Sequence, residues 1–151
     1  MGFIDAEASF SVSIKIQRDL RYGIRLDPVF SITQSSKKPL EVIAKIIGAG
    51  RIIKKPGQDH LYLLVIDNMS DLVNKLIPFL DKHMNLICAK EENYLIFREI
   101  VIALDKGLHK DRDTLKRLVH YAYNLSSLSK KARRRRSLCE IFTIIEAQTS
   151  K

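Results

Sequence analysis

Two acidic side chains, Asp5 and Glu7, stand near the start of the chain among otherwise small or apolar residues. Carboxylate oxygens are hard ligands of the kind that Mg²⁺ binds while it keeps several of its waters. Gly2 and Ala6 are four residues apart, so on a helix they share one face and let a second helix approach closely. We therefore predict that residues 1–8 are the end of a helix, with two acids near its last turn and small side chains on one face.

The elements that position this helix are predicted from the spacing of apolar residues. Period-two alternation indicates strands over 9–17, 25–34, 51–55 and 60–67, and helical spacing indicates helices over 38–47, 69–77, 89–104, 113–125 and 130–147. Pro78 is expected to end its helix, and Asp111 or Asp113 to cap the helix over 113–125. The order α-β-β-α-β-β-α-α-α-α predicts an α+β fold with one antiparallel sheet. We expect a single domain over 1–151, with a core of about 1–105 and C-terminal helices at about 111–148.

A sheet covered by helices on one side has a second face. The alternation gives that face short hydrogen-bonding side chains and scattered cations, which suit the base edges of a DNA groove better than a plain solvated surface does. Its mild charge favours the solvated alternative. In the second hairpin this interpretation turns Leu61, Leu63 and Val65 inward. The predicted DNA-binding residues are Ser9, Ser11, Ser13, Lys15, Gln17, Arg25, Asp27, Ser31, Thr33, Arg51, Lys55, His60 and Tyr62.

The net charge of +9 favours a polyanionic partner, but most of the excess is one run. Without the six cations of residues 130–136 the charge would fall to +3. We interpret Lys130, Lys131, Arg133 and Arg134 of this run as a phosphate clamp, with a solvated face or a nuclear-localisation signal as alternatives.

Two further features concern the compartment. No apolar stretch approaches the roughly 20 residues that cross a bilayer, so no membrane partner is expected. Cys88 and Cys139 fit no zinc spacing and are predicted to be buried thiols. We expect an intracellular protein of a prokaryotic cytoplasm or an organelle matrix or stroma.

Residues 2–7 (GFIDAE) resemble the LAGLIDADG motif, matched in sequence from its third letter. Met1 stands where the motif has Ala, and Ala8 replaces the final Gly. Residues 30–34 (FSITQ), 47–50 (IGAG), 78–80 (PFL) and 90–94 (KEENY) resemble further segments of members that carry a single motif. The chain thus resembles the single-motif, homodimeric, intron-encoded LAGLIDADG homing endonucleases.

The resemblance implies an α-β-β-α-β-β-α core and a dimer formed through Gly2, Phe3 and Ala6. It implies cleavage of a long, pseudo-palindromic double-stranded DNA site that leaves 3′ overhangs. The Glu7 carboxylate and the Ala6 carbonyl would bind Mg²⁺. Mn²⁺ is expected to substitute for it, and Ca²⁺ to bind without supporting cleavage.

Three other polar residues gain roles from the same resemblance. Gln34 would orient water near the scissile phosphate, unless it is an ordinary residue at a strand end. Lys90 would stabilise charge on the phosphate; nearby Lys82 is the alternative. Lys38 would reach the DNA backbone, with a solvated lysine as the alternative. Asp5 is expected to be structural.

Other classes of function remain open. An intron maturase that binds intron RNA, or a DNA- or RNA-binding protein without cleavage, could use the same scaffold. A structural basic protein on a membrane or ribosome would explain the arginine run but not the acidic motif.

Overall fold

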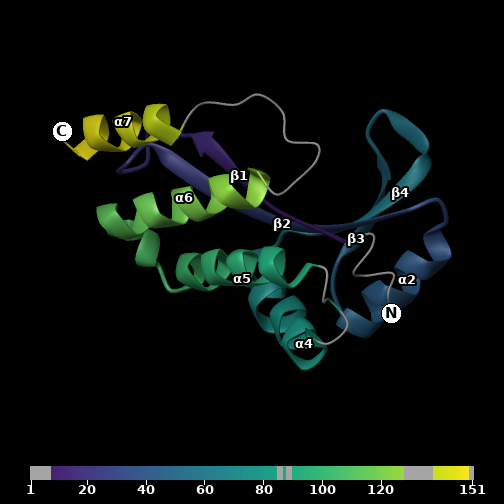
Figure 1. The fold of residues 1–151 in the computed structure, drawn as a ribbon. Helices are drawn as coiled ribbons and strands as arrows, with labels where there is room; N and C mark the ends of the chain where they lie inside the picture. Colours follow the sequence, from purple (N-terminus) through teal and green to yellow (C-terminus); the bar gives the residue numbers. More distant parts are fainter. Residues whose placement is uncertain (1–7, 85–86, 88–89, 128–137, 150–151) are drawn as a thin grey trace. The chain divides into compact units, whose positions relative to one another are not determined.

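The computed structural model describes residues 8–84, 87, 90–127 and 138–149. Its strands are β1 (Ala8–Ile16), β2 (Ile24–Gln34), β3 (Arg51–Lys55) and β4 (Gln58–Ile66), which form one four-stranded sheet in the order β1-β2-β4-β3 (Figure 1). β4 is antiparallel to both β2 and β3. The described residues thus confirm the predicted α+β class and its two hairpins.

The longer helices are α2 (Lys37–Ile47), α5 (Glu91–Asp105), α6 (Arg112–Ser127) and α7 (Leu138–Thr149), with a short 3-10 turn η4 (Leu108–Lys110) before α6. α2, α5 and α6 lie within two residues of their predicted ranges, whereas the predicted start of the last helix, residues 130–137, lies outside the described residues. α2 ends at Gly48, whose positive φ of 83° suits a residue without a β-carbon. The helix predicted over 1–8 lies outside the described residues except for Ala8, which already belongs to β1.

The prediction that Pro78 ends a helix was wrong. Helical structure continues through α3 (Met69–Asp71), the π-helical turn η1 (Leu72–Leu76) and α4 (Ile77–Lys82), with Pro78 in the first turn of α4. Proline lacks a backbone N–H and collides with the carbonyl four residues earlier. The wider π-helical turn directly before it changes the hydrogen-bonding register, so the chain stays helical.

The chain divides into two compact units, which we describe separately. Unit 1 consists of residues 1–10 and 29–95, and unit 2 of residues 11–28 and 96–151. The chain passes from one unit to the other within β1, β2 and α5. The single-domain organisation stays a prediction.

Unit 1 has an aromatic cluster that connects β1, β2 and α5. The Phe10 ring centroid lies 5.3 Å from that of Phe30 and 5.6 Å from that of Tyr94. The buried Tyr94 hydroxyl donates to Asp81 Oδ1 at 2.6 Å and also lies 3.3 Å from the carbonyl oxygen of Ile77. These contacts fix the start of α5 against α4 and against the beginning of β1.

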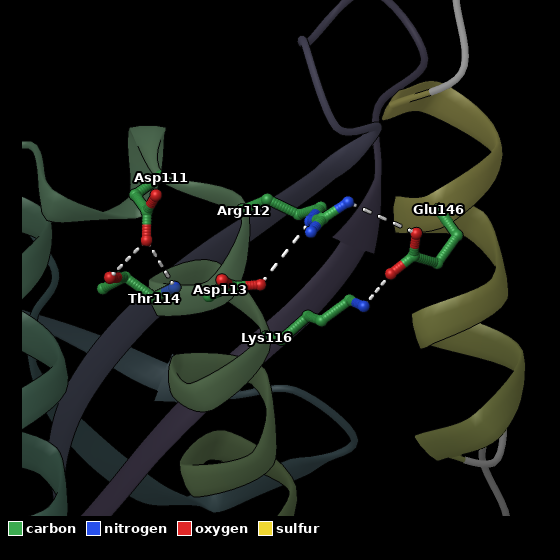
Figure 2. Close-up of polar contacts among 6 residues, drawn as sticks. All are labelled: Asp111, Arg112, Asp113, Thr114, Lys116 and Glu146. Atoms are coloured by element: carbon green, nitrogen blue, oxygen red, sulfur yellow. Dashed lines mark hydrogen bonds and ion pairs between the residues drawn. The ribbon is translucent and has the colours of Figure 1, made fainter.

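In unit 2, polar contacts cap α6 and join α6 to α7 (Figure 2). Asp111 caps α6, because its Oδ2 accepts from the Thr114 backbone N–H at 3.0 Å and from the Thr114 hydroxyl at 2.8 Å. These bonds lower the pKa of Asp111. Glu146 of α7 forms ion pairs with Lys116 and, at 3.7 Å, with Arg112, both of α6.

The structure bears on the predicted burial of the two cysteines and on the expected absence of membrane-spanning helices. Cys139 is exposed, so the prediction that it is buried was wrong. It is the second residue of α7, whose buried side chains are Ile141 and Ile145. Cys88 lies outside the described residues. None of the helices in the described part of the chain has the length and apolar character needed to cross a membrane.

Unit 2 also contains a cavity of about 590 Å³. It is lined by residues at the β1–β2 end, including Tyr22 and Arg25, and by Leu104, His109 and Leu115 from the helical part. The Nδ1 atom of His109 is buried and has no hydrogen-bond partner among the described residues. Burial and, to a smaller extent, the neighbouring Lys110 charge lower the pKa of His109.

Because the pKa of His109 is lowered on folding, this residue should destabilise the protein in mild acid. Below its ordinary pKa of about 6.5, the unfolded chain binds a proton there that the folded chain does not, so stability falls as the pH drops. His109→Phe removes the titrating group and the unpartnered nitrogen while keeping a ring. Its melting temperature, measured by circular dichroism, should fall less between about pH 7 and about pH 5 than that of the wild type. An equally steep fall in both proteins would contradict this role.

Candidate active site and nucleic-acid interface

The start of β1 is where the acidic motif meets the described structure. Ala8 follows Glu7 directly and is buried. Its carbonyl oxygen accepts a hydrogen bond of 2.7 Å from Nζ of Lys90, a residue 82 positions later in the chain. The ammonium group of Lys90 is therefore held at Ala8, the residue that follows Glu7 in the sequence.

Lys82, the alternative to Lys90, lies at the end of α4 with an exposed side chain. The next residue, His83, bonds through Nδ1 to the carbonyl oxygen of Phe79 at 2.7 Å and packs on the Phe79 ring. Of the two lysines, Lys90 has the contact with the motif segment.

Gln34 and Lys38 lie where β2 passes into α2. Gln34 is the last residue of β2 and pairs with Tyr62 of β4. β1 and β2 are neighbours joined by a short connection, so the end of β2 and the start of β1 lie at the same end of this hairpin. Gln34 thus shares that end with Ala8. Lys38 is exposed in the first turn of α2.

The polar face predicted for the first hairpin is present along both of its strands. In β1, Ala8, Phe10 and Val12 are buried, whereas Ser9, Ser11, Ser13 and Lys15 are exposed. In β2, Ile24, Leu26, Phe30 and Ile32 are buried, whereas Arg25 is exposed and Asp27, Ser31 and Thr33 are half-buried. Gln17 is half-buried directly after β1.

The predicted orientation of β4 was wrong. Directly paired residues share a face of an antiparallel sheet, and Thr33 pairs with Leu63 while Ser31 pairs with Val65. Leu63 and Val65 therefore lie on the polar face of β2, and Tyr62, which pairs with Gln34, lies on the other face. His60 is exposed within the register shift between β3 and β4. The run from Leu61 to Ile66 is apolar apart from the Tyr62 hydroxyl, so its sequence has no period-two signal to fix the orientation. Leu64 and Ile66 are the side chains buried on the inner face.

Arg51 begins β3 and forms a two-bond ion pair with Asp67, just after β4. Arg51 Nη1 donates to Asp67 Oδ1 at 2.7 Å, and Nη2 donates to Oδ2 at 3.0 Å. This pairing lowers the pKa of Asp67 and raises that of Arg51. Asp67 was not among the predicted site residues. In a hairpin, however, the start of the first strand lies beside the end of the second, and Arg51 and Asp67 occupy these two positions.

A second cluster lies on the β1–β2 hairpin in unit 2. Asp27 accepts from Arg25 Nε at 2.7 Å through Oδ1, and its Oδ2 lies 3.0 Å from Lys15 Nζ. All three residues belong to the predicted DNA-binding set. The spacing of Arg25 and Asp27, two apart on one strand face, is visible in the sequence, but their bond is not.

Several predicted site residues lie outside the described residues. They are Gly2, Phe3, Asp5, Ala6, Glu7, Lys130, Lys131, Arg133 and Arg134. Within the part that the structure describes, no three His, Cys, Asp or Glu side chains are grouped so that they could hold a metal ion. Lys55, the remaining predicted contact, is half-buried at a bulge between β3 and β4.

Comparisons with known proteins give consistent matches over this fold. The family model described as LAGLIDADG endonuclease matches residues 1–101. Homing endonuclease I-ApeII of Aeropyrum pernix is 49% identical over 146 residues, which cover 95% of this chain and 86% of that protein.

Solved structures extend the likeness to the whole chain. The archaeal intron-encoded homing endonuclease I-Vdi141I, solved in complex with DNA, superimposes with a TM-score of 0.94 at 47% identity, covering 99% of this chain and 94% of that one. The K262A mutant of I-SmaMI gives a TM-score of 0.76 at 26% identity, covering 94% of this chain but 47% of that one. This chain therefore matches nearly all of one structure and about half of the other.

Proposed function

Since this chain belongs to the LAGLIDADG endonuclease family, we propose that it is a homing endonuclease that cuts one long, pseudo-palindromic double-stranded DNA site. The observation that carries the proposal is the bond from Lys90 Nζ to the carbonyl oxygen of Ala8. It places a cation at the residue that follows the acidic motif in the sequence, and a cation there would stabilise the negative charge that develops on a scissile phosphate. The likeness to I-Vdi141I in its DNA complex supports DNA as the substrate.

In this proposal the motif residues hold a divalent metal, Mg²⁺ by preference. The carboxylate of Glu7 and the carbonyl of Ala6 are hard oxygen donors, which fit a small divalent cation that keeps several waters. When bound, such a metal activates water and stabilises the oxygen that leaves the phosphorus. Mn²⁺ would substitute, whereas Ca²⁺ would support binding alone.

The remaining groups act on the DNA phosphate. The Lys90 ammonium donates to the Ala8 carbonyl oxygen, and its charge would stabilise the negative charge that develops on the phosphate. Gln34, at the same hairpin end, would orient the attacking water. The cations of residues 130–136 would clamp the DNA backbone without reading its sequence.

Cleavage of its own insertion site tests this function. The purified protein is incubated with a duplex that joins the two exons of its host gene without the intron. We expect a double-strand cut with 3′ overhangs in Mg²⁺ and none in EDTA. Tight binding of intron RNA with the duplex left intact would instead favour a maturase.

We also propose that the active enzyme is a homodimer. One motif offers one carboxylate, and a two-strand cut at a pseudo-palindromic site needs two equivalent centres. Gly2, Phe3 and Ala6 would form the contact, in which the small side chains of Gly2 and Ala6 let two helices approach closely. The half-length match to I-SmaMI agrees with two copies acting together. Sedimentation of the DNA complex should give the mass of two chains, and an active complex with one chain would contradict the proposal.

A further inference from the structure

Two arginines of the predicted DNA-binding set differ in the nitrogen atoms they use for their carboxylate partners. Arg51 uses both terminal nitrogens, Nη1 and Nη2, on Asp67. Arg25 uses its inner nitrogen, Nε, on Asp27. The guanidinium carries five N–H donors in a fixed plane, four of them on the two Nη atoms.

This difference decides what each side chain can offer to another molecule. Both terminal nitrogens of Arg51 already donate to the Asp67 carboxylate. Arg51 would have to break these two bonds before it could donate to another pair of acceptors. No described residue accepts a hydrogen bond from the forked end of Arg25, and 56% of its side chain is exposed. Arg25 thus has two parallel donors without a described partner, at an exposed strand position between the buried Ile24 and Leu26.

Asp27 restricts the orientation of that fork. Its two oxygens are divided between Arg25 and Lys15, and its side chain is only 22% exposed. Holding Nε fixes the plane of the guanidinium, so less rotational freedom is lost when the fork binds. Asp27 is therefore a positioning residue for Arg25.

The carboxylate that contacts Arg25, rather than the net charge of the cluster, favours a base edge over a phosphate as the target. A carboxylate beside the fork repels a phosphate, which is itself an anion, but does not repel a neutral base. Guanine presents two acceptors, O6 and N7, in the major groove, and the forked end of arginine matches them in two parallel bonds. A two-stranded ribbon such as β1–β2 fits that groove.

We propose that Arg25, oriented by Asp27, reads a guanine in the major groove of the target, whereas Arg51 reads no base. The assignment rests on the proposed function, because it gives a base preference to the DNA site that the enzyme would cut. By the dimer's symmetry the guanine recurs once in each half of that site.

The test is selection of binding sites from a pool of duplexes with randomised sequence, carried out in Ca²⁺ so that the DNA stays uncut. The wild type, Arg25→Gln and Arg51→Gln are compared, and the matched arginine is the control. We expect Arg25→Gln to lose its preference for guanine at one position in each half-site by about 5- to 150-fold, with other positions unchanged. Arg51→Gln should select the same sequence as the wild type. Melting temperatures check that both variants are folded.

Asp27→Ala gives a second readout that a merely structural role would not produce. Removing the carboxylate releases the fork, so the preference for guanine should weaken at the position that Arg25 reads. The same change removes a negative charge from the DNA-facing side, so affinity for unrelated duplexes should rise. Specificity and non-specific affinity therefore move in opposite directions.

The outcomes separate the two proposals. If the wild type selects a sequence and Arg25→Gln selects the same one, the assignment fails while the proposed function stands. A uniform loss of affinity across all sequences, with a salt dependence reduced by about one charge, would also overturn it, because Arg25 would then bind a phosphate. If the wild type selects no sequence at all, both proposals fail.

Discussion

Glu7→Gln should reduce cleavage by roughly 1,000-fold or more while DNA binding persists, because metal activation is worth several kcal/mol of transition-state stabilisation. Glutamine keeps the size of the side chain but replaces a charged oxygen ligand with an uncharged amide. Cleavage is followed on the exon-junction duplex in Mg²⁺, and binding by gel shift in Ca²⁺. A variant that cuts at the wild-type rate would exclude Glu7 as a ligand.

Asp5→Asn is the matched control for that experiment. It makes the same change of charge two residues earlier, at an acid expected to be structural. We expect it to retain cleavage in Mg²⁺, even if it lowers the melting temperature. Loss of cleavage in the Asp5 variant alone would exchange the roles of the two acids.

Lys90→Met should slow cleavage by about 100-fold or more, the loss typical when one group that stabilises transition-state charge is removed. Methionine keeps much of the unbranched stem, so the change removes mainly the ammonium and its bond to Ala8. Single-turnover rates under saturating enzyme separate the chemical step from binding. Affinity in Ca²⁺ should change far less than the rate.

Lys82→Met is the control for Lys90, since it removes the same charge from an exposed position at the end of α4. Its cleavage rate should stay within about threefold of the wild type, as is usual for an exposed residue without specific contacts. A large loss at Lys82 and none at Lys90 would reverse the assignment that we favour.

The sequence predicted the first hairpin well because its two faces differ chemically. Serines alternate with Phe10 and Val12 along β1, and only one orientation of that strand buries the apolar set. The same reasoning failed for β4, where Leu63 and Leu64 are equally apolar and alternation has nothing to select. Pairing with β2, a contact between distant segments, fixes which of them is inside.

The site itself was predictable in composition but not in its contacts. The resemblance pointed to a lysine near residue 90, yet only the fold brings Lys90 to Ala8 across 82 positions of sequence. Similarly, the sequence alone does not distinguish Arg25 from Arg51, since each is an arginine in a predicted strand. They differ because Asp27 meets one through Nε and Asp67 meets the other through both Nη atoms.

The interleaving of the two units has a consequence for the order in which a ribosome delivers them. Residues 11–28 leave the ribosome early, but the rest of their unit, residues 96–151, is made only after residues 29–95 of the other unit. Until then Ile24 and Leu26 have no partners from the later segment, because Leu104 and Leu115, which line the same cavity, have not been made. Unit 2 therefore completes its folding only after unit 1 has been made, and a nascent chain of about 95 residues should be the form that most needs a chaperone.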